Sequence, residues 1–375
     1  MMPLRIGVDA REILGDSTGV GRYLGELLRR WTTRSDARSR RFVLYAPGLI
    51  PLPFPEGTVE HRIIQARGLG SIFGSGRGTW WEQTSLRHAV RREPLDVFFA
   101  PAYTAPLGVP VPLAVTIHDV SFFAHPEWFR PREGMRRRWL TARAAAAASV
   151  IFTDSEFSRA EIETHLGADR SRIRVIPPGV TPRHSIPGRR EPRAPLVLYA
   201  GSIFNRRRLP QLIAAFAAAT ADMREARLVI VGDDRTWPPQ DLRAVAEELG
   251  VASRVDLLSY VDDSALARLY ARAAVFAFLS EYEGFGLTPL EALAAGVPVL
   301  VLDTPVAREV YGGAVSYVDR GDEAGTVSVI RTLLTQPEAG RSTLARAPEV
   351  LGRYSWDRAA VETLAALERI ATGTR

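Results

Sequence analysis

Three consecutive arginines, Arg206, Arg207 and Arg208, follow an apolar run at residues 196–200 that has the composition of a buried strand. A guanidinium group is planar and always charged, and it can hold two phosphate oxygens at once. Because these arginines stand where a strand turns into a helix, the dipole of that helix adds to the same positive field. The segment predicts a diphosphate clamp in which two arginines serve and Arg208 lies at the surface. A solvated run of charges is the alternative.

A second candidate is the segment SEYEGFGLTPLE at residues 280–291, which follows another predicted strand. Two glycines between Glu283 and Thr288 permit a tight loop with exposed backbone N–H groups. Thr288 is typical of a helix N-cap, Pro289 of the first helical residue and Glu291 of the third, which together form a capping box. Glu291 can serve this cap and also accept hydrogen bonds from sugar hydroxyls. The cap leaves Glu283 without a structural role, so we interpret it as a site residue.

Two weaker candidates lie in the first half of the chain. The glycine-rich segment 15–21 includes Gly19 and Gly21 at the start of a predicted helix, where the backbone could approach an anion. A glycine-rich turn with a helix cap explains it equally well, and the segment is not the GxGxxG dinucleotide fingerprint. His118 and Asp119 end a predicted strand, where His118 could orient a reacting hydroxyl or phosphate. A structural histidine at a strand end is the alternative.

The elements that must position these residues alternate between short apolar strands and helices. We expect strands at residues 5–9, 42–46, 59–65, 97–100, 113–118, 150–153, 172–176, 196–200, 228–231, 255–258, 275–279, 298–302 and 315–318. We expect helices at residues 19–31, 80–91, 133–148, 156–165, 209–219, 241–249, 263–271, 289–295 and 304–310. This alternation predicts parallel sheets covered by helices on both faces. Residues 181–195 hold four prolines and four arginines without apolar periodicity, so they are the expected linker between two doubly wound domains.

Composition limits the classes of protein that this chain can belong to. Its 375 residues suggest two domains at roughly 100–200 residues each. No apolar run reaches the roughly 20 residues of a membrane-spanning helix. The chain has no cysteine and no lysine, which excludes disulfides, thiolate nucleophiles, Walker A loops and Schiff-base enzymes. A net charge of +6 favours an anionic partner: a phosphorylated small molecule, an anionic membrane surface or a nucleic acid.

These segments, in this order and spacing, resemble the retaining glycosyltransferases of family 4. The most specific part is the E-x7-E pattern from Glu283 to Glu291, followed by ALAAGVPV. Other stretches resemble landmarks of the family: GVG at 19–21, WWEQ at 80–83, TIHDVSF at 116–122, HPEW at 125–128, DSEFSR at 154–159, RVIPPG at 174–179 and LVIVG at 228–232. Residues 122–128 resemble the mannosyltransferase-type branch that builds bacterial surface polysaccharides.

The resemblance implies an α/β architecture with the GT-B fold, in which two doubly wound, Rossmann-like parallel-sheet domains face a cleft. Residues 1–182 would form the acceptor-binding domain and residues 183–355 the nucleotide-sugar donor-binding domain. Residues 356–375 would form a helix that crosses back to the N-terminal domain.

The resemblance also implies roles for single residues. Arg206 and Arg207 would hold the donor diphosphate, with Arg207 standing where the family usually has lysine, so that the charge is kept and its geometry changes. Glu283 would lie near the transferred sugar, and Glu291 would bind the ribose hydroxyls. The further donor-binding positions would be Gly284, Phe285, Gly286 and Leu287 for the sugar and phosphate, and Gly232, Tyr260 and Val261 for the base. In the first domain, four residues would face the donor phosphate and the acceptor: Gly19, Gly21, His118 and Asp119. His118 would be among the catalytic residues, and Asp119 would lie on the acceptor side.

The reaction that the resemblance implies moves a hexose, with GDP-mannose favoured as donor, to a saccharide or lipid-linked acceptor with retention at the anomeric carbon. It would need no metal and no cofactor, and it would serve cell-surface polysaccharide or glycoconjugate biosynthesis. Two alternatives stay open: a GT-B epimerase or hydrolase, and a non-catalytic nucleotide-sugar binding protein. A nucleic-acid binder fits the basic charge, but the arginines are scattered rather than gathered in a stripe with stacking aromatics.

The expected location is the cytoplasm, at the inner face of the membrane if the chain makes a peripheral contact there. The segment Arg136-Arg137-Arg138-Trp139 begins a predicted helix and joins positive charge with an aromatic side chain. Such a combination can rest on anionic lipid. An ordinary solvated helix face is the alternative.

Overall fold

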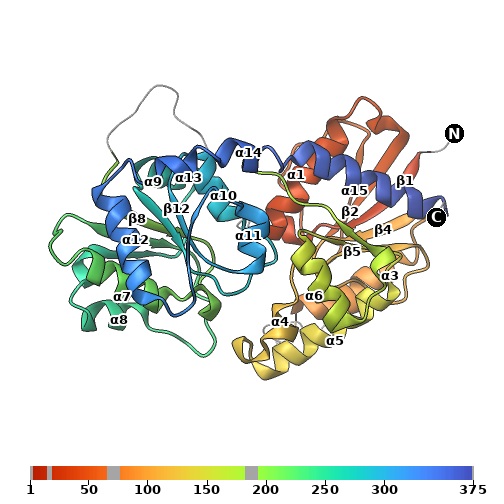
Figure 1. Ribbon diagram of the computed structural model, residues 1–375. Coiled ribbons are helices and arrows are strands. Elements are labelled where there is room, and N and C mark those ends of the chain that lie inside the picture. The colour runs from red at the N-terminus through yellow and green to blue at the C-terminus, as the bar shows by residue number, and fades with distance from the viewer. Residues whose placement is uncertain (1–2, 15–18, 66–76, 182–192, 374–375) are drawn as a thin grey trace. The chain divides into compact units, whose positions relative to one another are not determined.

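The computed structural model describes residues 3–14, 19–65, 77–181 and 193–373. Its contacts divide the chain into two compact units (Figure 1). The first unit comprises Met1–Ala124, Pro131–Gly179 and Ser355–Arg375, and the second comprises His125–Arg130 and Val180–Tyr354. No helix within the described residues is long and apolar enough to span a bilayer.

The first unit contains a seven-stranded sheet in the order β3-β2-β1-β4-β5-β6-β7, in which all neighbouring strands are parallel. Its strands are β1 Leu4–Asp9, β2 Arg40–Ala46, β3 Val59–Ile63, β4 Val97–Ala100, β5 Leu113–Thr116, β6 Val150–Thr153 and β7 Ile173–Val175. Every residue of β4, β5 and β6 is buried. Such fully buried strands are typical of a parallel sheet that is covered on both faces.

Two hydrophobic clusters cover the two faces of this sheet, because successive residues of a strand point to opposite sides. Phe99 belongs to one cluster and its neighbour Phe98 to the other. The helices of the first unit are α1 Gly19–Thr33, α2 Arg77–Trp81, α3 Arg87–Val90, α4 Ser121–Ala124, α5 Pro131–Ala147, α6 Glu156–Leu166 and α15 Trp356–Ala371. Shorter turns are η1 Arg11–Ile13, η2 Ala37–Ser39, the π-helical η4 Glu82–Leu86 and η6 Arg170–Arg172.

Helix α15, which the resemblance assigns to the C-terminal crossing helix, packs against α1 in the first unit (Figure 1). The indole N–H of the buried Trp31 in α1 donates a hydrogen bond of 2.8 Å to the carbonyl of Ala360 in α15. Arg30 on α1 and Asp357 on α15 form an ion pair of 2.6 Å at the edge of the same contact. The last helix therefore completes one of the two apolar clusters of the first unit.

The second unit contains a six-stranded parallel sheet in the order β10-β9-β8-β11-β12-β13. Its strands are β8 Leu196–Ala200, β9 Arg227–Val231, β10 Val255–Leu258, β11 Val275–Phe278, β12 Val299–Leu302 and β13 Ser316–Val318. Its helices are α7 Leu209–Ala219, α8 Leu242–Glu248, α9 Asp263–Arg272, α10 Leu287–Ala294, α11 Pro305–Tyr311, α12 Glu323–Thr335, α13 Arg341–Leu344 and α14 Ala347–Leu351. The turns η5 Pro126–Trp128, η7 Asn205–Arg207 and η8 Ala252–Arg254 complete it.

The predicted α/β class with two parallel sheets is confirmed, and all thirteen predicted strands occur with small shifts at their ends. The predicted helix at residues 80–91 is wrong in detail, because a π-helical turn, Glu82–Leu86, interrupts it. Helices α4, α12, α13 and α14 were not predicted. Residues 182–192 of the predicted linker and residues 15–18 of the first glycine-rich segment lie outside the described residues.

We predict that Leu364→Ala destabilises the first unit by about 2–5 kcal/mol, because it leaves a cavity where α15 packs. Leu364 is 2% exposed, whereas Val361 on the same helix is 47% exposed. The control Val361→Ala should therefore change the free energy of unfolding by less than about 0.5 kcal/mol. Urea denaturation followed by tryptophan fluorescence measures both variants. Equal effects of the two substitutions would contradict this packing.

Candidate functional site

Two loops of the second unit meet where its sheet reverses the order of its strands. One loop follows β8 and carries Arg206, Arg207 and Arg208, and the other follows β11 and begins at Ser280. Strands β8 and β11 are neighbours in the sheet but far apart in the sequence. The backbone N–H of Glu281 donates a hydrogen bond of 2.9 Å to the carbonyl of Arg206 and so ties the two loops together. Open parallel sheets bind ligands at such a switch point.

A buried cluster of ions forms between these loops. Arg207 approaches both carboxylate oxygens of Glu283, with Nε 2.8 Å from Oε1 and Nη2 donating a hydrogen bond of 3.1 Å to Oε2. The Nε of Arg206 lies 3.8 Å from Oε1 of the same carboxylate. The hydroxyl of Ser280 donates a further hydrogen bond to Oε1. The cluster therefore holds two positive charges against one negative charge.

Arg206 keeps hydrogen-bonding capacity that the protein does not use. Its buried Nε–H has no hydrogen-bond acceptor among the described residues, whereas the Nε of Arg207 lies 2.8 Å from Oε1 of Glu283 in an ion pair. The guanidinium group of Arg206 lies over the ring of Phe204 at 4.3 Å, and that of Arg207 over Phe278 at 4.4 Å. Burial lowers the pKa of Arg207, but Glu283 together with Tyr199 and Tyr311 raises it above its ordinary value. Since buried donors are almost always paired, the unused Nε–H of Arg206 beside a second guanidinium group indicates a site for an anion.

Arg208 points away from this cluster. Its backbone is left-handed, with φ 53°, and its Nε lies 3.5 Å from Oε1 of Glu281. The Nε of Arg320 approaches the same oxygen at 3.2 Å. The prediction that Arg208 serves no part of the clamp agrees with this geometry, but the prediction that it lies at the surface is wrong. Its side chain is only 16% exposed, because the left-handed turn directs it between Glu281 and a cavity.

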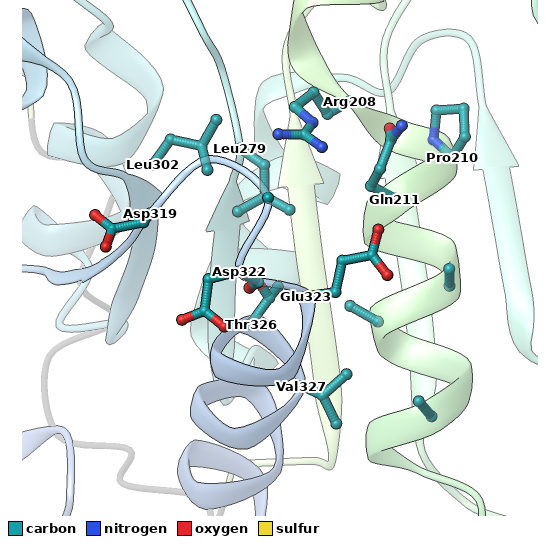
Figure 2. Close-up of a pocket in the computed structure, with 14 residues that line it drawn as sticks. Arg208, Pro210, Gln211, Leu279, Leu302, Asp319, Asp322, Glu323, Thr326 and Val327 are labelled. Carbon is teal, nitrogen blue, oxygen red and sulfur yellow. The ribbon is translucent and has the colours of Figure 1, made fainter.

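The cavity beside Arg208 has a volume of about 330 Å³ and lies between α7 and α12 (Figure 2). Figure 2 shows Arg208 and Gln211 from the start of α7 on one side, and Asp322 and Glu323 from the start of α12 on the other. Its floor is formed by small and apolar side chains, among them Leu279 and Leu302 at the ends of β11 and β12. None of the predicted site residues lines this cavity, so it is separate from the Arg206–Glu283 cluster.

The glycine loop before α10 differs from its prediction. Helix α10 begins at Leu287, its N-cap is Gly286, and no side chain caps it. The predicted capping box of Thr288, Pro289 and Glu291 is therefore wrong, because Gly286 takes a left-handed conformation, with φ 87°, and starts the helix earlier. Glu291 lies inside α10 and is 2% exposed, with Oε2 3.5 Å from the hydroxyl of Tyr270.

The other predicted donor-binding residues lie at the ends of neighbouring strands. Gly232 follows β9, and a Cβ atom there would lie 1.9 Å from the carbonyl oxygen of Gly201, so only glycine allows this close approach of two loops. Tyr260 and Val261 follow β10, and Tyr260 is 65% exposed. The structure thus places these residues at the same edge of the sheet as Arg206 and Arg207.

His118 lies at the corresponding edge of the first unit with 14% of its side chain exposed. Its Nδ1 lies 2.7 Å from Oδ2 of Asp154, and its Nε2 lies 3.1 Å from the carbonyl oxygen of Pro101. Since both partners are acceptors, both ring nitrogens carry protons in this arrangement. Burial opposes this charge, but the Asp154 carboxylate raises the pKa of His118 above its ordinary value. The geometry favours the structural alternative for His118, and its catalytic role stays a prediction.

The remaining candidates of the first unit also have local partners. Asp119 accepts hydrogen bonds from the backbone N–H and the hydroxyl of Ser121, at 2.8 and 2.6 Å, and thereby caps α4. Gly21 lets α1 approach η1, since a Cβ atom there would lie 2.1 Å from the carbonyl oxygen of Glu12. Gly19 begins α1 with open space around it. The acceptor and phosphate contacts predicted for these residues stay predictions.

Sequence reasoning missed several partners of the site residues. Ser280 and Asp154 directly follow buried strands, so the rule that ligands bind at the carboxyl ends of strands could have found both. A buried group of Asp9, Arg11 and Glu82 was also missed. Burial raises the pKa of Asp9 to about 6, although Arg11 opposes this shift. No local pattern joins Glu82 to Arg11, because they meet only in the folded chain.

We predict that His118 makes the stability of the first unit depend on pH. Because its folded pKa is raised, its contribution is fully present below the unfolded value of about 6.5 and is lost as the pH rises through the folded value. The difference in unfolding free energy between the wild type and His118→Gln should therefore be largest at acidic pH and shrink toward pH 9. Urea denaturation at several pH values measures it, with His88→Gln, on helix α3, as the control. A difference that does not change with pH would contradict the ion pair with Asp154.

Two family models and several curated proteins match this chain. Residues 17–184 match the family model described as Glycosyltransferase Family 4, and residues 183–349 match the one described as Glycosyl transferases group 1. The chain is 26% identical to the O-antigen chain mannosyltransferase B of Escherichia coli, over 92% of this chain and 95% of that protein. It is 30% identical to a GDP-mannose-dependent alpha-(1-6)-phosphatidylinositol dimannoside mannosyltransferase of Mycobacterium tuberculosis, over 62% of this chain and 61% of that protein.

The fold is also similar to that of a solved glycosyltransferase structure. The crystal structure of WaaG, a glycosyltransferase involved in lipopolysaccharide biosynthesis, superimposes with a TM-score of 0.74 at 19% identity and covers 97% of this chain and 99% of its own. The two parallel sheets, the order of the motifs and the matching family models agree. The chain belongs to the family 4-like glycosyltransferases with the GT-B fold, in their mannosyltransferase-like branch, and is a hexosyltransferase.

Proposed function

We propose that this protein transfers mannose from GDP-mannose to a saccharide or lipid-linked acceptor with retention at the anomeric carbon, in the synthesis of a cell-surface polysaccharide or glycoconjugate. The observation that carries the proposal is the pair of buried guanidinium groups of Arg206 and Arg207 that share the single carboxylate of Glu283 at the switch point of the second sheet. Their excess positive charge and the unused Nε–H donor of Arg206 suit the diphosphate of a nucleotide sugar. The names of the relatives support mannose as the sugar and GDP as the nucleotide.

In this proposal, Arg206 and Arg207 stabilise the negative charge that develops on the diphosphate as it leaves. Both guanidinium groups are buried and held by Glu283 and by aromatic rings, so little reorganisation is needed during the reaction. Fixed donors of this kind can supply most of the transition-state stabilisation without a metal. We therefore propose that the transfer needs no metal ion and no cofactor.

We propose that the backbone of Gly284 to Leu287 supports the sugar, that Glu283 faces the positive charge developing at its anomeric carbon, and that Glu291 holds the ribose. The acceptor hydroxyl attacks on the face from which the diphosphate departs. The bond from the anomeric carbon to the acceptor oxygen forms as the bond to the diphosphate oxygen breaks, and the hydroxyl proton passes to that departing oxygen. This step retains configuration and needs no separate carboxylate base.

The acceptor side is proposed at the carboxyl edge of the first sheet, where His118 and Asp119 lie. Asp154 fixes the ring of His118, and Asp119 caps the helix that follows it. Calorimetry with GDP-, UDP- and dTDP-sugars tests the donor. Product analysis with and without an acceptor separates transfer from hydrolysis and epimerisation. Binding without turnover would leave the protein a nucleotide-sugar binding protein.

We predict that Arg206→Ala lowers kcat/KM for the donor by an amount equal to about 2–4 kcal/mol of transition-state stabilisation, as expected when one fixed donor is removed. Arg331→Ala is the matched control, because Arg331 lies on the surface of α12 and pairs with Asp222. The control should keep wild-type activity. Full transfer activity in Arg206→Ala, measured by release of the nucleoside diphosphate, would refute the assignment.

We also propose a peripheral contact between helix α5 and anionic lipid at the inner face of the membrane. This helix carries five arginines and one glutamate. Met135 and Trp139 are 57% and 58% exposed, one helical turn apart. The guanidinium group of Arg143 lies 5.7 Å from the ring of Trp139. Exposed apolar side chains among arginines suit an anionic membrane surface.

We predict that Trp139→Ala weakens binding to phosphatidylglycerol vesicles by about tenfold, since one large apolar side chain then no longer enters the interface. Trp80→Ala is the control, because Trp80 is similarly exposed, at 56%, but belongs to a different helix, α2. Cosedimentation measures both variants, with phosphatidylcholine vesicles for comparison. Equal losses in the two variants, or equal binding to both lipids, would contradict the contact.

A further inference from the structure

A buried tyrosine, Tyr311, contacts the backbone of the glycine loop before α10. The hydroxyl of Tyr311, the last residue of α11, donates a hydrogen bond of 2.9 Å to the carbonyl of Gly286 and lies 3.3 Å from the carbonyl of Phe285. Tyr311 is 2% exposed. Its hydroxyl therefore reaches two consecutive carbonyls at the point where the loop turns into the helix.

The hydroxyl also fills the space beside Gly286. A Cβ atom at position 286 would lie 2.1 Å from the hydroxyl oxygen of Tyr311 and 3.4 Å from the carbon that bears it. Gly286 is the N-cap of α10, its backbone is left-handed, and no side chain caps the helix. Because the Tyr311 hydroxyl donates to carbonyls, it holds the turn that leads into α10 and does not cap the N–H groups of that helix.

A second tyrosine, Tyr354, contacts the side chain of Phe285 in the same loop. The ring of Tyr354 meets that of Phe285 edge to face, with 5.0 Å between the ring centres. The hydroxyl of Tyr354 donates a hydrogen bond of 2.9 Å to the carbonyl of Val310, next to Tyr311. Tyr354 is the last residue of the second unit before the chain returns to the first unit at Ser355.

We propose that Tyr311 and Tyr354 are positioning residues for hexose transfer: they hold the backbone of Phe285 and Gly286 in the conformation that receives the donor sugar. This inference rests on the proposed function, since it takes that loop as the sugar-binding backbone. Arg206 and Arg207 bind the diphosphate from a different loop. Loss of either tyrosine contact should therefore impair turnover while binding of the nucleoside diphosphate persists.

The first test compares Tyr311→Phe with Tyr317→Phe. Tyr317 is the matched control, because its hydroxyl donates to the carbonyls of Ala307 and Gly312 rather than to those of Phe285 and Gly286. Tyr311→Phe should lower kcat about tenfold and change the Kd of GDP less than about twofold, since one oriented hydrogen bond is lost from the loop alone. Tyr354→Leu should show the same division between kcat and Kd. Tyr317→Phe should keep both values.

The second test is a double-mutant cycle with Gly286→Ala. The new methyl group collides with the hydroxyl oxygen of Tyr311, and Tyr311→Phe removes that oxygen. Gly286→Ala should therefore lower kcat several-fold less in the Tyr311→Phe background than in the wild type, as expected for two groups in contact. Additive effects of the two substitutions on kcat would contradict a contact between the hydroxyl of Tyr311 and residue 286.

The outcomes separate this inference from the proposed function. If the wild type binds GDP and Arg206→Ala does not, while Tyr311→Phe keeps wild-type kcat, the positioning role is wrong and the donor site stands. If Tyr311→Phe and Tyr317→Phe lose kcat equally, the tyrosines only stabilise the fold and the inference fails. If the wild type binds no nucleoside diphosphate at all, the proposed function itself is wrong.

Discussion

Two guanidinium groups share one buried carboxylate at the switch point of the second sheet, and the other features of the site depend on this arrangement. Burying a charge is costly unless it is paired and hydrogen-bonded. Glu283 compensates only one of the two charges, and the Nε–H of Arg206 has no acceptor among the described residues. An anion that binds here supplies a second negative charge and an acceptor for that donor. Binding of a diphosphate would thus offset the cost of burying two guanidinium groups beside one carboxylate.

The surrounding fold keeps this arrangement in place. The two loops belong to neighbouring strands, and the hydrogen bond from Glu281 to Arg206 fixes the distance between them. Aromatic rings under each guanidinium group limit its movement, and the hydroxyl of Ser280 holds the carboxylate. The glycine loop is oriented separately, from α11, through Tyr311. The proposed diphosphate site and the proposed sugar site therefore lie on two different loops. Different parts of the second unit hold these two loops in place.

The sequence predicted the parts of this structure that depend on local pattern. Short apolar runs bounded by turns predicted the strands because parallel strands are buried on both faces. The loops that carry the site residues were predicted from the rule that ligands bind at the carboxyl ends of parallel strands. Helix α12 was missed because β-branched residues and Gly325 weaken its pattern, although Asp322 caps it and Ile330 and Leu333 are buried. The capping box before α10 was wrong because Gly286, in a left-handed conformation, begins the helix earlier, and the tyrosine that contacts it stands 25 residues away in the sequence, where no local pattern indicates it. The enclosure of His118 by Asp154 likewise depends on two strands that meet only in the folded chain.

A crystal structure of the protein with GDP-mannose, or with GDP alone, tests the central claim most directly. The account predicts that β-phosphate oxygens lie within hydrogen-bond distance of the guanidinium groups of Arg206 and Arg207, with those groups turned partly from Glu283 toward the ligand. A diphosphate found instead in the cavity between α7 and α12, or bound without contact to either arginine, would contradict it.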